Sequence, residues 1–133
     1  MTNKKITSVG IIMDGNRRWA KERDLSSVDG HRAGYEKLKE VVAWAKDLDI
    51  RHMIVYGFST ENWNRSEEEV EYLMELFRAL LKEESEKIKK EVGRLRIVGQ
   101  RERFPKDIQE EMARAEEETE EGEYTLWLAL SYG

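Results

Sequence analysis

The stretch Ile6-Thr7-Ser8-Val9-Gly10-Ile11-Ile12-Met13-Asp14-Gly15-Asn16-Arg17-Arg18 passes directly from an apolar run into a polar cluster. It predicts a buried strand over residues 6–12, followed by a short helix that runs through Trp19 and Lys21. The same pattern recurs further along, where the apolar residues 52–58 lead into the polar residues 59–65. Two strands that each end in a polar loop suggest a sheet with a ligand site at one edge.

The rest of the chain alternates helical and extended patterns. Apolar residues at helical spacing predict a helix over residues 31–48. Ser66 and Glu69 predict a capping box for a long helix that continues to about residue 91. A strand over residues 94–99 comes next, then a helix that starts near Pro105 and stops by Gly122. The last strand, residues 124–131, is apolar on both faces and should therefore lie in the interior of the sheet.

This order of elements predicts an α/β fold with a mainly parallel sheet of about four strands flanked by helices. No internal repeat and no linker interrupts the chain, so residues 1–133 are expected to form one continuous domain. In such sheets ligands bind beyond the carboxyl ends of the strands. Residues 14–18 and 59–65 are therefore the candidate site.

Composition narrows the chemistry. The chain has no cysteine, which excludes a cysteine zinc site or a thiol nucleophile and fits a reducing, cytoplasmic location. Its first apolar run is too short for a signal peptide or a membrane span, so any membrane contact should come from outside, through a bound product. The net charge of −5 argues against nucleic acid as a partner.

The first loop suits a small anionic ligand. Gly15 lets the backbone approach closely, Asn16 can donate or accept, and Arg17 and Arg18 carry forks that match phosphate oxygens. Asp14 has the wrong charge for phosphate, but it makes sense if Mg²⁺ lies between the carboxylate and the phosphates. In the alternative interpretation Asp14 only caps the following helix and the arginines are solvated.

The second loop adds weaker candidates. Arg65 could supply another cation, held in place by Ser59 and Asn62. Trp63 is expected to pack, against the long helix, and Glu61 suits an ion pair or a backbone N–H better than acid catalysis. His31 begins the second helix, from where its ring can reach the same edge of the sheet; a lone histidine is more often structural.

These loops resemble the signatures of cis-prenyltransferases of the undecaprenyl diphosphate synthase type. The resemblance is carried by residues 11–20, by Gly30-His31-Arg32-Ala33-Gly34, and by residues 56–65. Residues 73–77, 97–99 and 128–133 are also similar to later parts of the family, so the likeness runs from about residue 6 to the last residue. It implies an enzyme that lengthens an allylic diphosphate, such as farnesyl diphosphate, with isopentenyl diphosphate in cis geometry.

The resemblance also implies roles for individual residues. Asp14 would orient Mg²⁺, while His31 and Asn62 would line the reacting centre with Ser59 beside them. Met13 and Trp63 would border the site or a tunnel for the growing chain near Leu73 and Phe77. The remaining substrate-binding candidates are Gly15, Asn16, Arg17, Arg18, Trp19, Glu61 and Arg65.

Two departures from the family pattern affect these expectations. Ser27 stands where the family usually has an arginine, which should weaken the grip on the diphosphate. The similarity also ends at Gly133, before the family's arginine and serine cluster for isopentenyl diphosphate, a second carboxylate for Mg²⁺ and much of the homodimer contact. A sheet that ended at the strand over residues 124–131 would leave that strand unpaired.

Several functions remain open at this point. The chain could be one polypeptide of a split synthase, whose second chain brings the remaining half. It could instead be a stand-alone or self-associating (homo-oligomeric) module that binds allylic diphosphates without turning them over, or a truncated product of an ordinary enzyme. A catalytically incompetent regulatory subunit is a further alternative. Such a subunit would not need Asp14 and Arg18, yet both are present, which disfavours this alternative. A nucleotide-binding α/β domain is disfavoured, because the chain lacks a Gly-rich phosphate loop.

Overall fold

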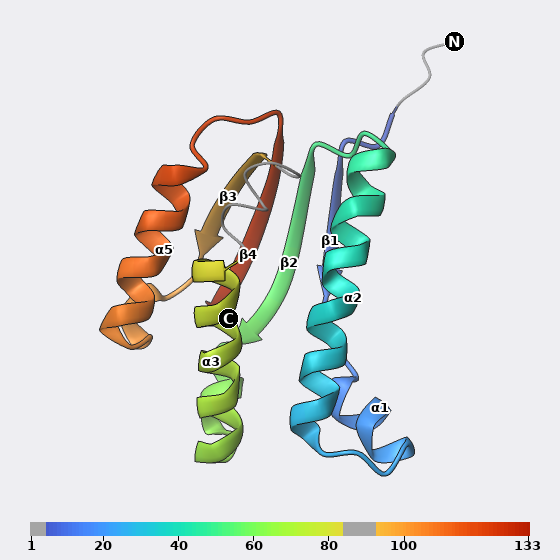
Figure 1. The fold of residues 1–133 in the computed structure, drawn as a ribbon, viewed down its shortest axis with the longest axis vertical. Helices are drawn as coiled ribbons and strands as arrows, with labels where there is room; N and C mark the ends of the chain where they lie inside the picture. The colour runs from blue at the N-terminus through green and yellow to red at the C-terminus, as the bar shows by residue number, and fades with distance from the viewer. Residues whose placement is uncertain (1–4, 84–92) are drawn as a thin grey trace.

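Four parallel strands form one sheet in the order β1-β2-β4-β3. The computed structural model describes residues 5–83 and 93–133. The strands are β1 (Ser8–Ile12), β2 (His52–Ser59), β3 (Gly93–Val98) and β4 (Tyr124–Tyr132). The helices are α1 (Asn16–Glu22), α2 (Ser27–Asp47), α3 (Glu67–Glu83) and α5 (Lys106–Glu118), with 3-10 turns η1 (Thr60–Asn64) and η2 (Arg101–Arg103). The predicted α/β fold with four parallel strands is confirmed (Figure 1).

The last strand lies inside the sheet, as its two apolar faces predicted. β4 pairs with β2 on one side and with β3 on the other. The expectation that its far side would be unpaired is therefore wrong, because the chain forms β3 at the edge and then returns to insert β4. The edge strand β3 is closed by α5: Thr119 Oγ1 accepts the N–H of Leu95 at 2.9 Å, and Glu116 Oε2 accepts the N–H of Ile97 at 3.0 Å.

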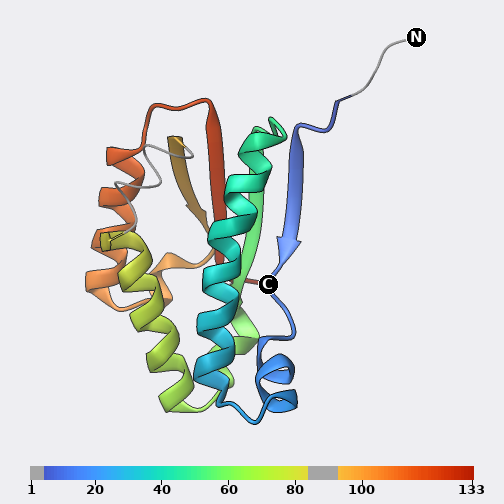
Figure 2. The same ribbon diagram turned by 45° about the vertical axis from the view of Figure 1, so that its right-hand side comes forward.

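One face of the sheet carries the core. The strand register aligns Ile11, Val55, Leu128 and Ile97 in one row, and α2 and α3 lie over this face, with α5 beside β3 (Figures 1 and 2). The next row, Ile12, Tyr56, Ala129 and Val98, faces the other way. Exposures of 69% for Ile12, 37% for Tyr56 and 43% for Val98 show that the described helices leave this second face open.

Two helix boundaries differ from the sequence prediction. α2 begins at Ser27, four residues early, because Ser26 and Asp29 form a reciprocal capping box. α5 ends at Glu118 rather than at Gly122, since the buried Thr119 turns its hydroxyl onto the carbonyl of Ala115 at 2.7 Å. The predicted continuation of α3 to about residue 91 lies outside the described residues.

The register places the two candidate loops side by side. Ile12, the last residue of β1, is aligned with Tyr56 of β2, and the N–H of Met13 donates to the carbonyl of Tyr56 at 3.3 Å. Both strands point the same way, so the polar loops that follow them meet at one edge of the sheet (Figure 1). Within the described ranges, none of the helices combines the length and the apolar character needed to cross a membrane.

Candidate anion-binding site

The loop after β1 is fixed by close contact between α1 and α2. Gly15 precedes α1 with φ of 84°, a left-handed conformation that glycine adopts without strain. A Cβ at Gly30 would lie 2.2 Å from the carbonyl oxygen of Asn16, and one at Gly34 would lie 2.6 Å from its amide oxygen. Two glycines one turn apart on α2 thus allow the first turn of α1 to lie directly against that helix. The contact also positions His31, which follows Gly30, beside the loop.

A polar cavity of about 270 Å³ opens at this edge of the sheet. Its lining comes from the loop after β1, from α1 and α2, from the end of β2, and from η1, Arg65 and α3. The lining residues are Met13, Asp14, Gly15, Asn16, Arg17, Arg18, His31, Gly57, Asn62, Arg65 and Leu73. The structure therefore brings together most of the residues that the two loops nominated.

A buried carboxylate lies behind the cavity. Glu69 Oε1 lies 2.9 Å from His31 Nε2, 3.4 Å from Arg17 Nε and 3.5 Å from Arg65 Nη1. The carboxylate is 6% exposed and the histidine 8%, so their hydrogen bond is shielded from water. Three elements, α1, α2 and α3, are thereby tied to a single oxygen atom.

The other polar side chains of the cavity have different partners. Asp14 is exposed, and its Oδ1 accepts the N–H of Gly15 at 2.8 Å. It does not cap α1, whose N-cap residue is Gly15. Asn62 accepts the N–H of Ser59 at 2.9 Å through Oδ1 and so fixes the loop after β2. Arg18 forms no ion pair with any residue that the structure describes.

Several predicted contacts are not formed. Ser59 and Asn62 do not hold the Arg65 side chain, which pairs with Glu69 instead. Ser66 does accept the N–H of Glu69, but the Glu69 carboxylate lies against His31 rather than closing a capping box.

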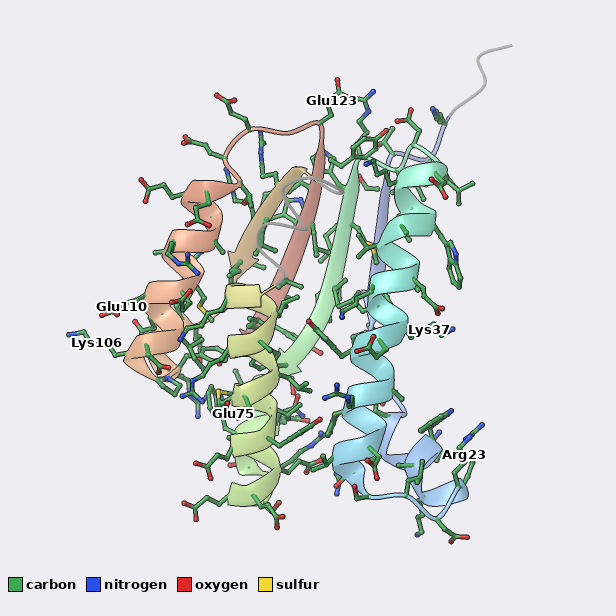
Figure 3. All side chains as sticks on the ribbon, in the orientation of Figure 1. Arg23, Lys37, Glu75, Lys106, Glu110 and Glu123 are labelled. Atoms are coloured by element: carbon green, nitrogen blue, oxygen red, sulfur yellow. The ribbon has the colours of Figure 1, made fainter. Side chains whose placement is uncertain are left out.

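Three aromatic or acidic candidates lie outside the polar cavity. Trp63 packs on Phe58 and Phe104 at 4.7 and 5.0 Å between ring centroids, and its Nε1 donates to Ser131. Trp19 stacks under Arg23, which lies at the end of α1 (Figure 3), and lines a neighbouring cavity. Glu61 is exposed and has no ion-pair partner in the described part of the chain.

Two apolar spaces adjoin the polar cavity. One of about 70 Å³ runs between α2 and α3 over the sheet and shares Met13, Asn16, His31, Gly57 and Leu73 with it. Its far end is lined only by apolar and aromatic groups, among them Phe77, Leu80 and Leu128. A second, of about 460 Å³, lies on the other side of Asp14 against β1 and α2. A ligand with a charged head and an apolar tail fits the first arrangement.

The donor set fits Mg²⁺ only in the presence of a phosphate ligand. The described residues contain no group of three His, Cys, Asp or Glu side chains able to hold a metal by themselves. Mg²⁺ commonly keeps several waters and binds through one or two carboxylates together with substrate phosphates. The single exposed carboxylate of Asp14 beside three arginines matches that pattern.

Comparison with known proteins identifies the family. Residues 12–133 match the prenyltransferase family described as undecaprenyl diphosphate synthase. The chain belongs to this family. An isoprenyl transferase of Thermotoga maritima is 44% identical over 126 residues, which are 94% of this chain and 54% of that protein. A tritrans,polycis-undecaprenyl-diphosphate synthase of Pyrococcus abyssi, described as geranylgeranyl-diphosphate specific, is also 44% identical, over 94% of this chain and 48% of its own length.

Solved structures of prenyltransferases share the fold. Lavandulyl diphosphate synthase from Lavandula x intermedia, crystallised with dimethylallyl diphosphate, superposes with a TM-score of 0.90 at 28% identity. The alignment covers 96% of this chain and 55% of that one. A probable undecaprenyl diphosphate synthase from Campylobacter jejuni gives a TM-score of 0.79 at 27% identity, over 98% and 57% of the two chains. This chain of the prenyltransferase family thus spans about half the length of the relatives it matches.

Glu69 is the residue of the site that sequence reasoning missed. Its sequence position suggested only a helix cap, because Ser66 stands three residues before it. A signal was present nonetheless: Arg65 stands four residues before Glu69, a spacing at which opposite charges commonly pair on helices. In the structure Arg65 precedes α3 with extended backbone and still reaches Glu69. Its contacts with Arg17 and His31 depend on tertiary packing.

Proposed function

We propose that this chain supplies the allylic-diphosphate site of a cis-prenyltransferase, which joins an allylic diphosphate such as farnesyl diphosphate to isopentenyl diphosphate. The observation that carries the proposal is a polar cavity with three arginines that opens directly into an apolar space between α2 and α3. A relative of the same fold was crystallised with dimethylallyl diphosphate, itself an allylic diphosphate.

The diphosphate is bound by the cations of the polar cavity. Arg18 has no ion pair to give up among the described residues, so its guanidinium is the readiest donor to phosphate oxygens. Arg65 and Arg17 add charge from two further directions. Gly15 and Asn16 allow the ligand to approach the loop backbone.

Asp14 would hold Mg²⁺ beside the diphosphate. The ion would supply stabilisation of the negative charge that develops on a departing diphosphate. The three arginines act on the same charge from inside a partly closed cavity, where such interactions are stronger than in water. His31 lines both the polar and the apolar cavity and Asn62 lines the polar one, so both side chains lie near the proposed place of the reacting carbon.

The hydrocarbon chain lies in the apolar space over the sheet. Met13 and Leu73 line both cavities and therefore flank the passage from head group to tail. Burying the apolar tail there is favourable by roughly 25 cal/mol for each Å² removed from water. The small volume of about 70 Å³ implies that α2 and α3 separate to admit a long chain.

Turnover needs residues beyond the described cavity. Its three arginines suffice for one diphosphate, while the reaction brings two together. We propose that the additional residues cover the open face of the sheet around Tyr56 and Val98, where apolar side chains are exposed. They can come from the same polypeptide, from a second chain or from another copy in a homo-oligomer.

Incorporation of labelled isopentenyl diphosphate in the presence of farnesyl diphosphate and Mg²⁺ tests this function. The chain of 133 residues alone should give no elongation, and a polypeptide that completes it should restore elongation. In the completed enzyme Asp14→Ala should lower the rate by a hundredfold or more, as for the loss of a key group that stabilises developing charge. Unchanged activity of Asp14→Ala would refute the metal role, and elongation by the wild-type chain alone would refute the need for further residues.

A further inference from the structure

Among the described residues, Arg17 is the most exposed of the three side chains that contact the Glu69 carboxylate, which are His31, Arg17 and Arg65 (together with Glu69, the Glu69 cluster). Its side chain is 59% exposed, compared with 28% for Arg65. Its Nε lies 3.4 Å from Glu69 Oε1, well beyond the roughly 2.7–2.9 Å of a charge-assisted hydrogen bond. Arg17 also lines the polar cavity, so the same guanidinium faces both a carboxylate and the ligand space.

Glu69 serves more groups than one oxygen can satisfy equally. His31 makes the short contact with Glu69 Oε1, at 2.9 Å. Arg17 and Arg65 approach the same oxygen only to 3.4 and 3.5 Å. The ion pair between Arg17 and Glu69 is long and its arginine is 59% exposed, so although the carboxylate is buried it contributes only up to about fivefold in an equilibrium constant. A guanidinium fork on a diphosphate gains more, on the order of tenfold or above.

We propose that Glu69 and a bound diphosphate compete for Arg17, so that Arg17 transfers from the carboxylate to the ligand on binding. Glu69 is then a positioning residue that keeps Arg17 at the mouth of the cavity and lowers the affinity for the anion. The inference rests on the proposed function, because a diphosphate must first enter the cavity.

Competition between Glu69 and the ligand for Arg17 lowers the affinity for diphosphate, whereas a Glu69 that only held the arginines in place would raise it. A ligand that must take a partner from an internal competitor binds more weakly, in proportion to the fraction of the partner that is free. Removing the Glu69 charge should therefore tighten diphosphate binding by about twofold to fivefold. A carboxylate that merely pre-organised the arginines would make the same substitution weaken binding.

A double-mutant cycle with inorganic diphosphate and Mg²⁺, followed by calorimetry, tests the competition. Arg17→Ala should weaken binding in the wild-type chain, and weaken it more, by about tenfold or above, in the Glu69→Gln background, where Arg17 is no longer shared. Glutamine keeps the size of Glu69 and a hydrogen-bonding group for His31. Arg32→Ala, which removes a neighbouring exposed charge outside the cavity, is the matched control and should change affinity in neither background.

Two outcomes would overturn the inference. Weaker binding by Glu69→Gln, or an equal effect of Arg17→Ala in both backgrounds, would show that the two anions do not compete. If Glu69→Gln fails to fold, the NMR signal of the Arg17 Nε–H in the wild-type chain decides: it should shift on addition of diphosphate, and an unmoved signal at saturation would refute the transfer. Absence of any binding of diphosphate or farnesyl diphosphate to the wild-type chain would remove the proposed function and this inference with it.

Discussion

A methyl group at Gly30 would test the contact that builds the site. A Cβ there would lie 2.2 Å from the carbonyl oxygen of Asn16 and 2.9 Å from its carbonyl carbon. A carbon and an oxygen in favourable contact are about 3.3–3.6 Å apart, so the two helices would have to separate by about 1 Å. Because the obstructing atoms belong to the backbone of α1, no side-chain rotation relieves the clash.

The magnitude follows from two opposing effects. Overpacking of this kind costs about 1–3 kcal/mol, occasionally more. Replacing glycine by alanine inside a helix gains about 1 kcal/mol in helix propensity. The Cβ would meet two backbone atoms of Asn16 at 2.2 and 2.9 Å, so the overpacking cost should lie at the upper end of its range, about 3 kcal/mol. The expected result for Gly30→Ala is therefore a net loss of about 2 kcal/mol in the free energy of unfolding.

Gly34→Ala is the matched control on the same helix. Its Cβ would meet the amide group of the Asn16 side chain at 2.6 Å, and a side chain can rotate away where a backbone cannot. The variant should therefore stay within about 1 kcal/mol of wild type. Urea unfolding followed by tryptophan fluorescence measures both. Gly30→Ala as stable as wild type, or more stable, would show that α1 is not held rigidly against α2 and would refute the reasoning.

Two further predictions concern the framework. Burial raises the pKa of Glu116, but hydrogen bonds from Arg101 and from a backbone N–H lower it by more, so its folded pKa lies below the ordinary 4.5. The stability that this carboxylate contributes is present above the ordinary pKa and is lost as the pH falls through the folded pKa. Glu116→Gln should therefore lose less stability than wild type on acidification. Urea unfolding at a series of acidic pH values measures the difference. Trp63→Phe should cost about 1–2 kcal/mol in unfolding free energy, because it removes the 2.9 Å hydrogen bond to Ser131, whereas Trp44→Phe at a 53% exposed position should cost far less.

The sequence was sufficient for the order and type of the elements. Apolar runs predicted the four strands of the described sheet, because these strands are buried. Helical periodicity predicted the helices between them, because each helix packs one apolar side against the sheet. The sequence could also have placed the start of α2 correctly, since Ser26 and Asp29 have the spacing of a capping box. The insertion of β4 between β2 and β3 could not be read locally, because strand order depends on pairing between distant segments.

The sequence predicted the loops that form the site but not the side-chain contacts between its helices. Asp14, Arg18 and Arg65 stand next to strand ends, and parallel strands bring such ends together. The Glu69 cluster joins α1, α2 and α3, and the approach of α1 to α2 depends on the space that Gly30 leaves. Contacts of this kind follow from packing rather than from any local pattern.

Calorimetric titration of the purified chain with farnesyl diphosphate, with and without Mg²⁺, tests the central claim most directly. The account predicts saturable one-to-one binding that requires Mg²⁺ and weakens by about tenfold or more in Arg18→Ala, with Arg32→Ala unchanged. Binding of equal strength without Mg²⁺ and in Arg18→Ala, or no binding by the folded wild-type chain, would contradict the assignment of this cavity as the allylic-diphosphate site.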